Sequence, residues 1–217
     1  MCNSAQVKEE VEAIACFPTM VYIAKKPEFV QNVLLASNDS IKKENKSIDE
    51  IYPCVMSGDL LDDPRIEQFA HYVGQTSYDM LHGHGYDLNG LSTTFTSMWC
   101  QEHHKHSLME QHVHGDGTQL VGFYFLEVPE NSSNAVFYDP RAGKVQAGLR
   151  ERDIKEISHA SNAMVFKPEV GMLIFAPAWL PHAFGRHASD KPLKFIHFNI
   201  GVIANNNNCN VSHAEVI

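Results

Sequence analysis

Three residues that could bind a metal, His112, His114 and Asp116, stand at every second position of one short segment, and His182 lies in a later apolar segment. On an extended strand, residues i, i+2 and i+4 point to the same face. Neutral imidazole is the commonest metal ligand in proteins, and open sites with two histidines and one carboxylate select non-haem Fe(II). The spacing therefore predicts a mononuclear metal site made by neighbouring strand residues and one distant histidine.

The residues leave two sets of ligands open. One set combines His114 and Asp116 with His182, and the other combines His112 and His114 with His182. Glycines flank Asp116 on both sides, and Gly-Asp-Gly favours a hairpin turn, which would interrupt the alternation of the strand. We therefore favour the three histidines and keep Asp116 as the alternative ligand. A hydrogen-bonded His-Val-His pair on a polar sheet face is the simpler interpretation, but a buried third histidine without a partner would be costly.

Strands make up most of the chain that should position these residues. Apolar residues recur at helical spacing over 27–36 and over 62–81, where Pro64 suits a first turn, whereas the polar stretch 38–50 is expected to be a loop. From residue 91 onward, β-branched and aromatic segments alternate with turn signals, which indicates an all-β sandwich or barrel. The expected strands cover 17–26, 91–100, 109–114, 120–128, 134–138, 163–167, 171–176, 182–187 and 193–203.

Composition limits the classes of partner and the compartment. The formal net charge of -9 and the pI near 5.8 argue against nucleic acid or an anionic membrane as a partner, because both require a basic face. The five cysteines form no CxxC pair, so we expect reduced thiols. Residues 1–20 carry acidic side chains where a signal peptide needs an apolar segment, which predicts a cytoplasmic protein. The histidine-rich stretch 103–106 is expected to be a solvated loop.

A set of motifs in the second half of the chain resembles one known group of enzymes. The motifs are Trp99, His-Val-His at 112–114, GFYFLE at 122–127, VFYDPR at 136–141, PEVGMLIFAPAWLPH at 168–182 and KFIHFNIG at 194–201. Together they resemble the 2-oxoglutarate and Fe(II)-dependent oxygenase superfamily, and within it the oxygenases of tailed phages, especially marine and cyanobacterial ones. The resemblance covers roughly residues 90–203 and, more weakly, Phe-Pro-Thr at 17–19.

The resemblance implies a fold and a division of the chain. The fold is mainly β with flanking α-helices, a double-stranded β-helix of the jelly-roll, cupin-like kind, over residues 91–203. Residues 1–90 would add a strand and helices packed on this core, and residues 204–217 would form a flexible polar tail.

The resemblance also implies the cofactors. Fe(II) would be held by His112, His114 or Asp116, and His182, and 2-oxoglutarate would chelate the metal. Oxidative decarboxylation of 2-oxoglutarate by O2 would yield succinate and CO2 and drive oxidation of a substrate. In relatives the far carboxylate of 2-oxoglutarate often pairs with an arginine a few residues before the Phe-Asn pair. This chain has no arginine there, and Lys194 is the expected substitute.

Three further residues receive expected roles from the same resemblance. Tyr124 could supply a hydroxyl to 2-oxoglutarate, although a core aromatic is an equal interpretation. Arg141, in the Asp-Pro-Arg turn, is expected to face the cosubstrate or the substrate. His197 shares a strand face with Phe195 and Asn199, and we expect it to lie in the core or beside the metal ligands.

The sequence leaves three functional hypotheses. The leading one is an Fe(II)- and 2-oxoglutarate-dependent dioxygenase that hydroxylates a small molecule or a protein side chain. The second is a cupin-like metalloenzyme with three histidine ligands that does not use 2-oxoglutarate, which the missing arginine favours. The third is a non-catalytic jelly-roll module of a phage, because fold does not dictate function. The amphipathic helix and the edge strands could also support a homodimer.

Overall fold

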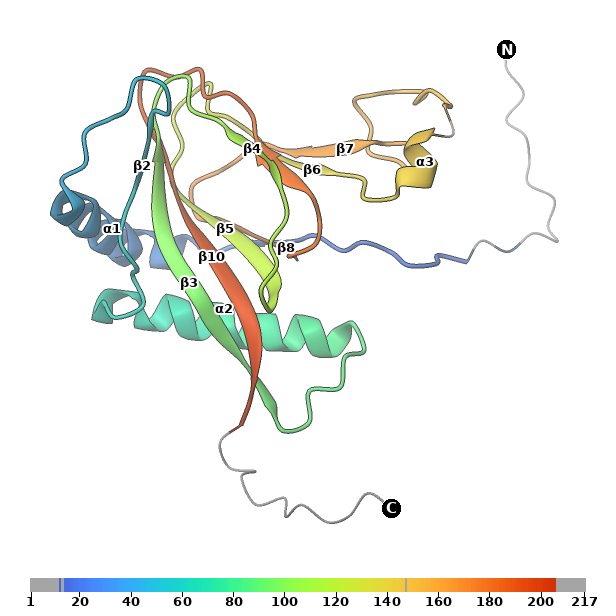
Figure 1. The fold of residues 1–217 in the computed structure, drawn as a ribbon, viewed down its shortest axis with the longest axis horizontal. Coiled ribbons are helices and arrows are strands. Elements are labelled where there is room, and N and C mark those ends of the chain that lie inside the picture. Colours follow the sequence, from blue (N-terminus) through green and yellow to red (C-terminus); the bar gives the residue numbers. More distant parts are fainter. Residues whose placement is uncertain (1–11, 13, 147, 206–217) are drawn as a thin grey trace.

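The computed structural model describes residues 12, 14–146 and 148–205, which form two antiparallel β-sheets that pack against each other (Figure 1). The larger sheet has six strands in the spatial order β1 (Tyr22–Lys25), β8 (Met172–Pro177), β5 (Thr118–Glu127), β10 (Leu193–Ala204), β3 (Leu91–His103) and β2 (Cys54–Met56). The smaller sheet has four strands in the order β4 (Met109–His112), β9 (His182–Phe184), β6 (Ala135–Tyr138) and β7 (Ala163–Phe166). The predicted fold class, a mainly β jelly roll with flanking helices, is confirmed.

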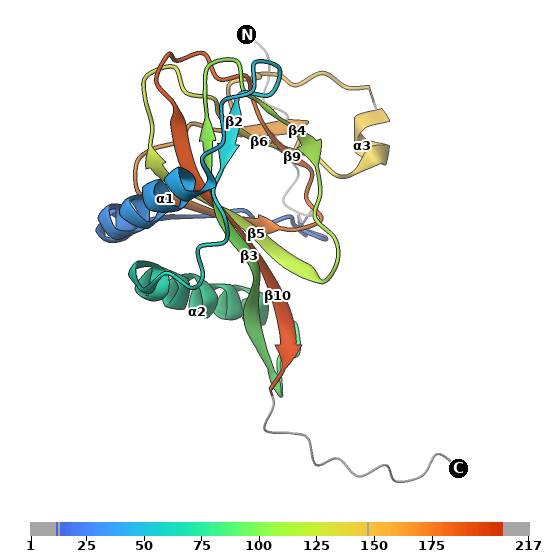
Figure 2. The ribbon, with the colours of Figure 1, turned by 60° about the vertical axis from the view of Figure 1, so that its left-hand side comes forward.

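Two longer helices lie against the outer face of the larger sheet (Figures 1 and 2). They are α1 (Val30–Glu44), which follows the short helix η1 (Pro27–Phe29), and α2 (Glu67–Gly83), which follows η2 (Pro64–Ile66). The side chain of Asp63 accepts a hydrogen bond from the backbone N–H of Arg65 and caps the start of this second helical region. The expectation of a loop from residue 38 is wrong, because α1 continues to Glu44. Its polar residues form the solvated side of an amphipathic helix.

Alternate side chains of β5 and β10 point to opposite faces of the larger sheet. Phe123, Phe125 and Phe195 lie between the two sheets, in a core shared with β6 and β9. Tyr124 and Phe198 lie on the outer face, in a second core formed with α1 and α2. The period of two along each strand therefore decides whether a side chain faces the interior of the jelly roll or the helices.

The outer core requires glycine at position 122 of β5. Gly122 pairs with Phe198 of β10, and a Cβ atom at Gly122 would lie 2.0 Å from the ring Cζ of Phe198. The Phe198 ring is fully buried and has little room to move. Gly122→Ala is therefore expected to lower the free energy of unfolding by about 1–3 kcal/mol.

Urea denaturation would measure this loss of stability. Gly143→Ala is the matched control, because no atom lies within 4 Å of a Cβ atom built at Gly143. Equal stability of the Gly122→Ala variant and the wild type would contradict the packing described for the outer core.

Two further features concern membrane-spanning helices and the C-terminal segment of the chain. No helix in the described part of the chain is long and apolar enough to cross a membrane. Strand β10 continues to Ala204, and most of the predicted flexible tail, residues 206–217, lies outside the described residues. The division at residue 90 stays a prediction.

Candidate metal centre

Three histidine side chains from two strands and a loop converge at one end of the smaller sheet. His112 ends β4, His114 follows in the β4–β5 loop, and His182 begins β9. His112 and His182 are paired residues of neighbouring strands, and one nitrogen of each of the three rings lies within 4.8 Å of the others. The ring centroids of His112 and His182 are 4.4 Å apart. We refer to His112, His114 and His182 as the histidine triad.

Backbone carbonyl groups orient two of these rings. The Nδ1–H of His112 donates to the carbonyl of Glu110 (2.8 Å), and the Nδ1–H of His182 donates to the carbonyl of Leu180 (2.9 Å). Because a carbonyl only accepts, each ring carries its proton on Nδ1 and leaves a lone pair on Nε2. The Nε2 atoms of His114 and His182 are buried and have no hydrogen-bond partner among the described residues. Unpaired imidazole nitrogens that converge in this way suit a metal ion.

Burial keeps two members of the triad in the form that binds metals. Loss of contact with water lowers the pKa of His114 and the pKa of His182 to about 4 in each case, and the neighbouring His112 contributes in the same direction. His114 and His182 are therefore neutral at pH 7, each with a free lone pair. A divalent cation would meet these two neutral rings beside His112.

Asp116 lies outside the triad. The residue has φ 51°, in the left-handed region, and its side chain is exposed in the turn between β4 and β5. The turn expected from the flanking glycines is present and removes Asp116 from the face that carries the histidines. The geometry therefore favours three histidines over two histidines and a carboxylate.

Lys194 does not face the triad, contrary to the expected role in binding 2-oxoglutarate. Its neighbours on β10 in the outer core are Ile196 and Phe198, and its Nζ donates to the Oδ1 of Asn38 of α1 (2.6 Å). The same ammonium forms ion pairs with Glu102 (3.0 Å) and Glu127 (3.1 Å). Burial opposes the charge, but the two carboxylates raise the pKa of Lys194. The sheet itself separates this cation from the triad.

Tyr124 also points away from the triad. Its ring stacks on Phe69 of α2, with centroids 4.6 Å apart, and its hydroxyl donates to the carbonyl of Lys26. Burial raises the pKa of the Tyr124 hydroxyl above its usual range. The expected contact between this hydroxyl and 2-oxoglutarate is wrong, because Tyr124 occupies the helix-facing side of β5. Tyr124 is instead a core aromatic residue, which was the alternative interpretation of the sequence.

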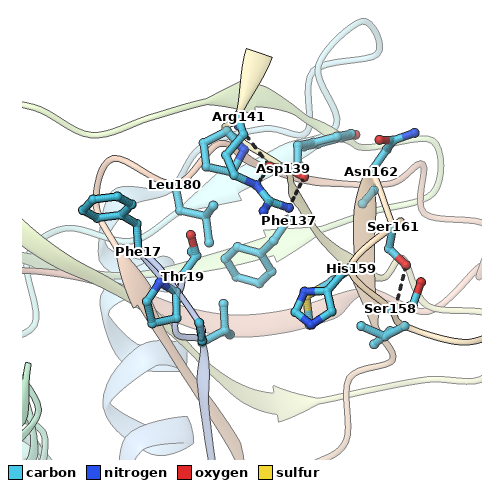
Figure 3. Close-up of a pocket in the computed structure, with 18 of the residues that line it drawn as sticks. Phe17, Thr19, Phe137, Asp139, Arg141, Ser158, His159, Ser161, Asn162 and Leu180 are labelled. Carbon is cyan, nitrogen blue, oxygen red and sulfur yellow. Dashed lines mark hydrogen bonds and ion pairs between the residues drawn. The ribbon is translucent and has the colours of Figure 1, made fainter. Parts of the chain in front are cut away.

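Arg141 is one of the residues that line a cavity of about 730 Å³ (Figure 3). Its guanidinium donates to both carboxylate oxygens of Asp139, at 2.9 and 2.7 Å. Figure 3 shows Phe17, Leu180 and Phe137 among the side chains that line this cavity. None of the three triad histidines lines it, but Phe137 lies between the cavity and the triad, because its ring centroid is 5.9 Å from that of His182.

Two polar residues of the interior were not predicted from the sequence. Gln101 and His103 lie on the inner face of β3 and are 3% and 1% exposed, respectively. The expectation of a solvated loop from residue 103 is wrong for His103, because β3 extends to this residue and pairs it with Leu193 of β10. His197 of β10 also lies in this interior, 1% exposed, as its strand face suggested. Gln101 joins His103 to His197 by hydrogen bonds.

The buried His103 predicts how stability depends on pH. Burial lowers its pKa from 6.5 to about 4 in the folded protein. A group with a lowered folded-state pKa binds its proton more weakly in the folded state, so it stabilises the fold above pH 6.5 and loses this effect as pH falls to 4. The free energy of unfolding of the metal-free protein should fall by on the order of 2 kcal/mol for this residue over that interval.

Urea denaturation at a series of pH values measures this dependence. His103→Asn should make the profile less steep without levelling it, because His114 and His182 also have lowered pKa values. The same substitution at His71, whose side chain is exposed, is the matched control. A wild-type profile that stays level between pH 6.5 and 4 would contradict a buried neutral His103.

Comparison with known proteins finds one family model and a set of solved structures that resemble parts of this chain. A family model described as "Putative 2OG-Fe(II) oxygenase" matches residues 97–199, the span that contains the triad. This family uses Fe(II), 2-oxoglutarate and O2. No curated protein matches the chain.

Several solved structures share the fold of this chain at low sequence identity. A prolyl-4-hydroxylase from Pseudomonas putida has a TM-score of 0.59 and 8% identity, with 84% of this chain and 93% of that chain covered. A viral collagen prolyl hydroxylase from Paramecium Bursaria Chlorella virus-1, solved with 2-oxoglutarate, has a TM-score of 0.53 and 14% identity, with coverage of 83% and 94%. HygX from Streptomyces hygroscopicus, solved with nickel and 2-oxoglutarate, has a TM-score of 0.52 and 11% identity, with coverage of 84% and 83%. The family match and the shared fold support the 2-oxoglutarate and Fe(II)-dependent oxygenase superfamily.

Proposed function

We propose that this chain is an Fe(II)- and 2-oxoglutarate-dependent oxygenase that hydroxylates a substrate and converts 2-oxoglutarate and O2 to succinate and CO2. The observation that carries the proposal is the histidine triad, in which three imidazole nitrogens lie within 4.8 Å of one another. His112, His114 and His182 would hold the metal. Iron, once bound with 2-oxoglutarate, supplies the oxidising chemistry that side chains lack.

The charges of the proposed ligands fit the cosubstrate. Three neutral histidines leave the full charge of a divalent cation at the centre, whereas a carboxylate ligand would neutralise part of it. 2-Oxoglutarate is a dianion, so its binding would balance the charge of the metal in the low-dielectric space between the sheets. The backbone carbonyls of Glu110 and Leu180 would keep His112 and His182 oriented while 2-oxoglutarate binds.

The substrate would enter the cavity next to Phe137 and Leu180 (Figure 3). The cavity volume of about 730 Å³ lies within the 300–1,000 Å³ typical of small-molecule sites, and it also has room for one protein side chain. Related structures include two prolyl hydroxylases and HygX, which was also solved with hygromycin B bound. The proposed substrate is therefore a small molecule or a protein side chain. The cytoplasmic location and the phage origin of the protein stay predictions.

Formation of succinate tests the proposal. Purified protein with Fe(II), 2-oxoglutarate and O2 should release succinate slowly without substrate, and His114→Ala should abolish this release while its fold is retained. Absence of succinate from iron-loaded wild-type protein, together with failure of 2-oxoglutarate to bind, would reject the proposed reaction.

A second function is favoured by one specific observation. The inner-facing residues of β10 are Leu193, Phe195, His197 and Asn199, none of which is a cation, so the usual basic partner of 2-oxoglutarate is missing from this strand. A cupin-like enzyme with three histidine ligands needs no such partner. Binding of iron without any binding of 2-oxoglutarate would favour this second function.

A further inference from the structure

A row of buried polar side chains runs along the inner face of β3 and β10 towards the triad. Gln101 of β3 lies between His103 and His197, and these three side chains are 3%, 1% and 1% exposed, respectively. Both rings contact the aromatic core, so the row is surrounded by apolar groups. Most buried polar groups have a hydrogen-bond partner, because water is excluded, so a buried polar group without one calls for an explanation.

The hydrogen bonds of Gln101 fix where each histidine carries its proton. The Oε1 of Gln101 only accepts, so the Nε2–H of His103 donates to it (2.9 Å). The Nε2 of Gln101 only donates, so Nδ1 of His197 accepts from it (3.3 Å). A neutral His197 with an accepting Nδ1 must carry its proton on Nε2. This is the opposite tautomer to that of His112 and His182, which carry the proton on Nδ1.

The Nε2–H of His197 is a buried donor without a partner. It has no hydrogen-bond acceptor in the part of the chain that the structure describes. The His197 ring lies next to the triad, with centroid distances of 5.2 Å to His114 and 6.5 Å to His182. His197 does not belong to the group whose ligand atoms lie within 4.8 Å of one another. His197 is therefore a donor close to the metal centre and is not placed as a fourth ligand.

The rest of β10 leaves His197 as the donor nearest to the triad on this strand. Leu193 and Phe195, the inner-facing residues on one side of it, are apolar and fully buried. Lys194 is on the outer face and is paired with Glu102 and Glu127. On the other side, the amide nitrogen of Asn199 donates to the Ser97 hydroxyl (3.0 Å). Among the side chains of β10, the His197 N–H is thus the donor left free for an acceptor bound beside the triad.

We propose that His197 donates its Nε2–H to the far carboxylate of 2-oxoglutarate, and that Gln101 and His103 hold His197 in the tautomer that allows this. The inference rests on the proposed function. A neutral donor replaces the cation that the strand lacks, and a hydrogen bond to a charged carboxylate is among the stronger ones in proteins. His197 would touch the cosubstrate, whereas Gln101 and His103 would be positioning residues that act through it.

The tautomer is tested without metal or cosubstrate. Nitrogen-15 NMR of protein labelled in the histidine rings distinguishes Nε2–H from Nδ1–H, and His197→Leu identifies the signals of His197. The expected result is Nε2–H at His197 in the wild type and a mixture of both tautomers in Gln101→Leu. An Nδ1–H signal at His197 in the wild type, or an unchanged tautomer in Gln101→Leu, would overturn the inference.

Binding of two matched ligands tests the contact itself. 2-Oxoglutarate and 2-oxopentanoate have the same chelating end, but 2-oxopentanoate carries a methyl group in place of the far carboxylate. Anaerobic titrations of the Fe(II)-loaded protein, followed by the visible absorption band of an iron-bound 2-oxoacid, give both affinities. His197→Leu should weaken binding of 2-oxoglutarate roughly 10- to 100-fold and leave that of 2-oxopentanoate unchanged. His197→Gln, which restores an N–H donor, should recover part of the loss.

The outcomes separate this inference from the proposed function. If 2-oxoglutarate binds and His197→Leu has no effect, or weakens both ligands equally, the inference is overturned and the proposed function stands. If neither 2-oxoacid binds to iron-loaded wild-type protein, the proposed function fails and the inference fails with it. Lys194→Met is the control on the outer face and should leave the affinity of both ligands unchanged.

Discussion

Replacement of His182 by alanine is expected to weaken Fe(II) binding at least about 100-fold, because even residues that only support metal ligands cost 10–100-fold when they are lost. His182 is the member of the triad that is best fixed, with 1% exposure and its Nδ1–H bound to the carbonyl of Leu180. Its Nε2 is buried without a partner among the described residues, so removal of the ring deletes one proposed ligand and leaves no protein group to replace it.

Anaerobic titration with Fe(II), or with Co(II) as a stable substitute, measures this effect. Asp116→Ala is the matched control and should change the affinity by less than about twofold, within ordinary surface effects, because Asp116 is exposed outside the triad. A large loss of affinity in Asp116→Ala would show that the loop rearranges to bring its carboxylate to the metal. If His182→Ala keeps the full affinity for Fe(II), the triad is not the site that binds the metal.

Lys194→Met is expected to destabilise the fold by about 2–3 kcal/mol, somewhat less than the loss of one partner from a fully buried ion pair. The Lys194 side chain is 8% exposed and lies between Glu102, 16% exposed, and Glu127, 45% exposed. Without the ammonium, the carboxylate of Glu102 stays largely buried and faces a second negative charge. The half-exposed Glu127 is better solvated, which moderates the loss.

Two controls make this prediction specific. Lys25→Met breaks an ion pair with Glu169 in which both side chains are mostly exposed, so it should change stability by less than about 1 kcal/mol. Addition of Glu102→Gln to Lys194→Met should recover part of the lost stability, because it removes the uncompensated charge. Denaturation with urea provides the comparison. If Lys194→Met leaves stability unchanged but weakens binding of 2-oxoglutarate, Lys194 binds the cosubstrate, as the sequence first suggested.

Part of the fold and of the triad was accessible from short-range spacing in the sequence. Alternation along strands and turn signals between them predicted an all-β sandwich or barrel, and His112 with His114 followed from the same period of two. The jelly roll was implied by the family resemblance, and His182 was chosen because it lies in a distant apolar segment. The turn expected at Asp116 from its flanking glycines is present, whereas its exclusion from the metal ligands stays a prediction. The helix α1 was cut short, because polar residues beyond position 38 were interpreted as a loop and not as the solvated side of a helix.

The errors at the site arose where a side chain was assigned by its distance along the chain. Lys194 and His197 are three residues apart on β10, so they must face opposite sides of the sheet. The sequence thus contained the signal that Lys194 lies with the helices. Tyr124 is adjacent to Phe123, which faces the triad, and alternation excludes both from the same face. Burial of His103 was not accessible, because it depends on the pairing of β3 with β10.

The most direct test of the proposed centre is the addition of 2-oxoglutarate to Fe(II)-loaded protein under anaerobic conditions, followed by visible absorption. The triad predicts one iron per chain and a new charge-transfer band when 2-oxoglutarate chelates it, and neither should occur in His182→Ala. Iron that binds at the triad and gives no band at saturating 2-oxoglutarate would contradict the proposed oxygenase and favour a three-histidine enzyme of another reaction class.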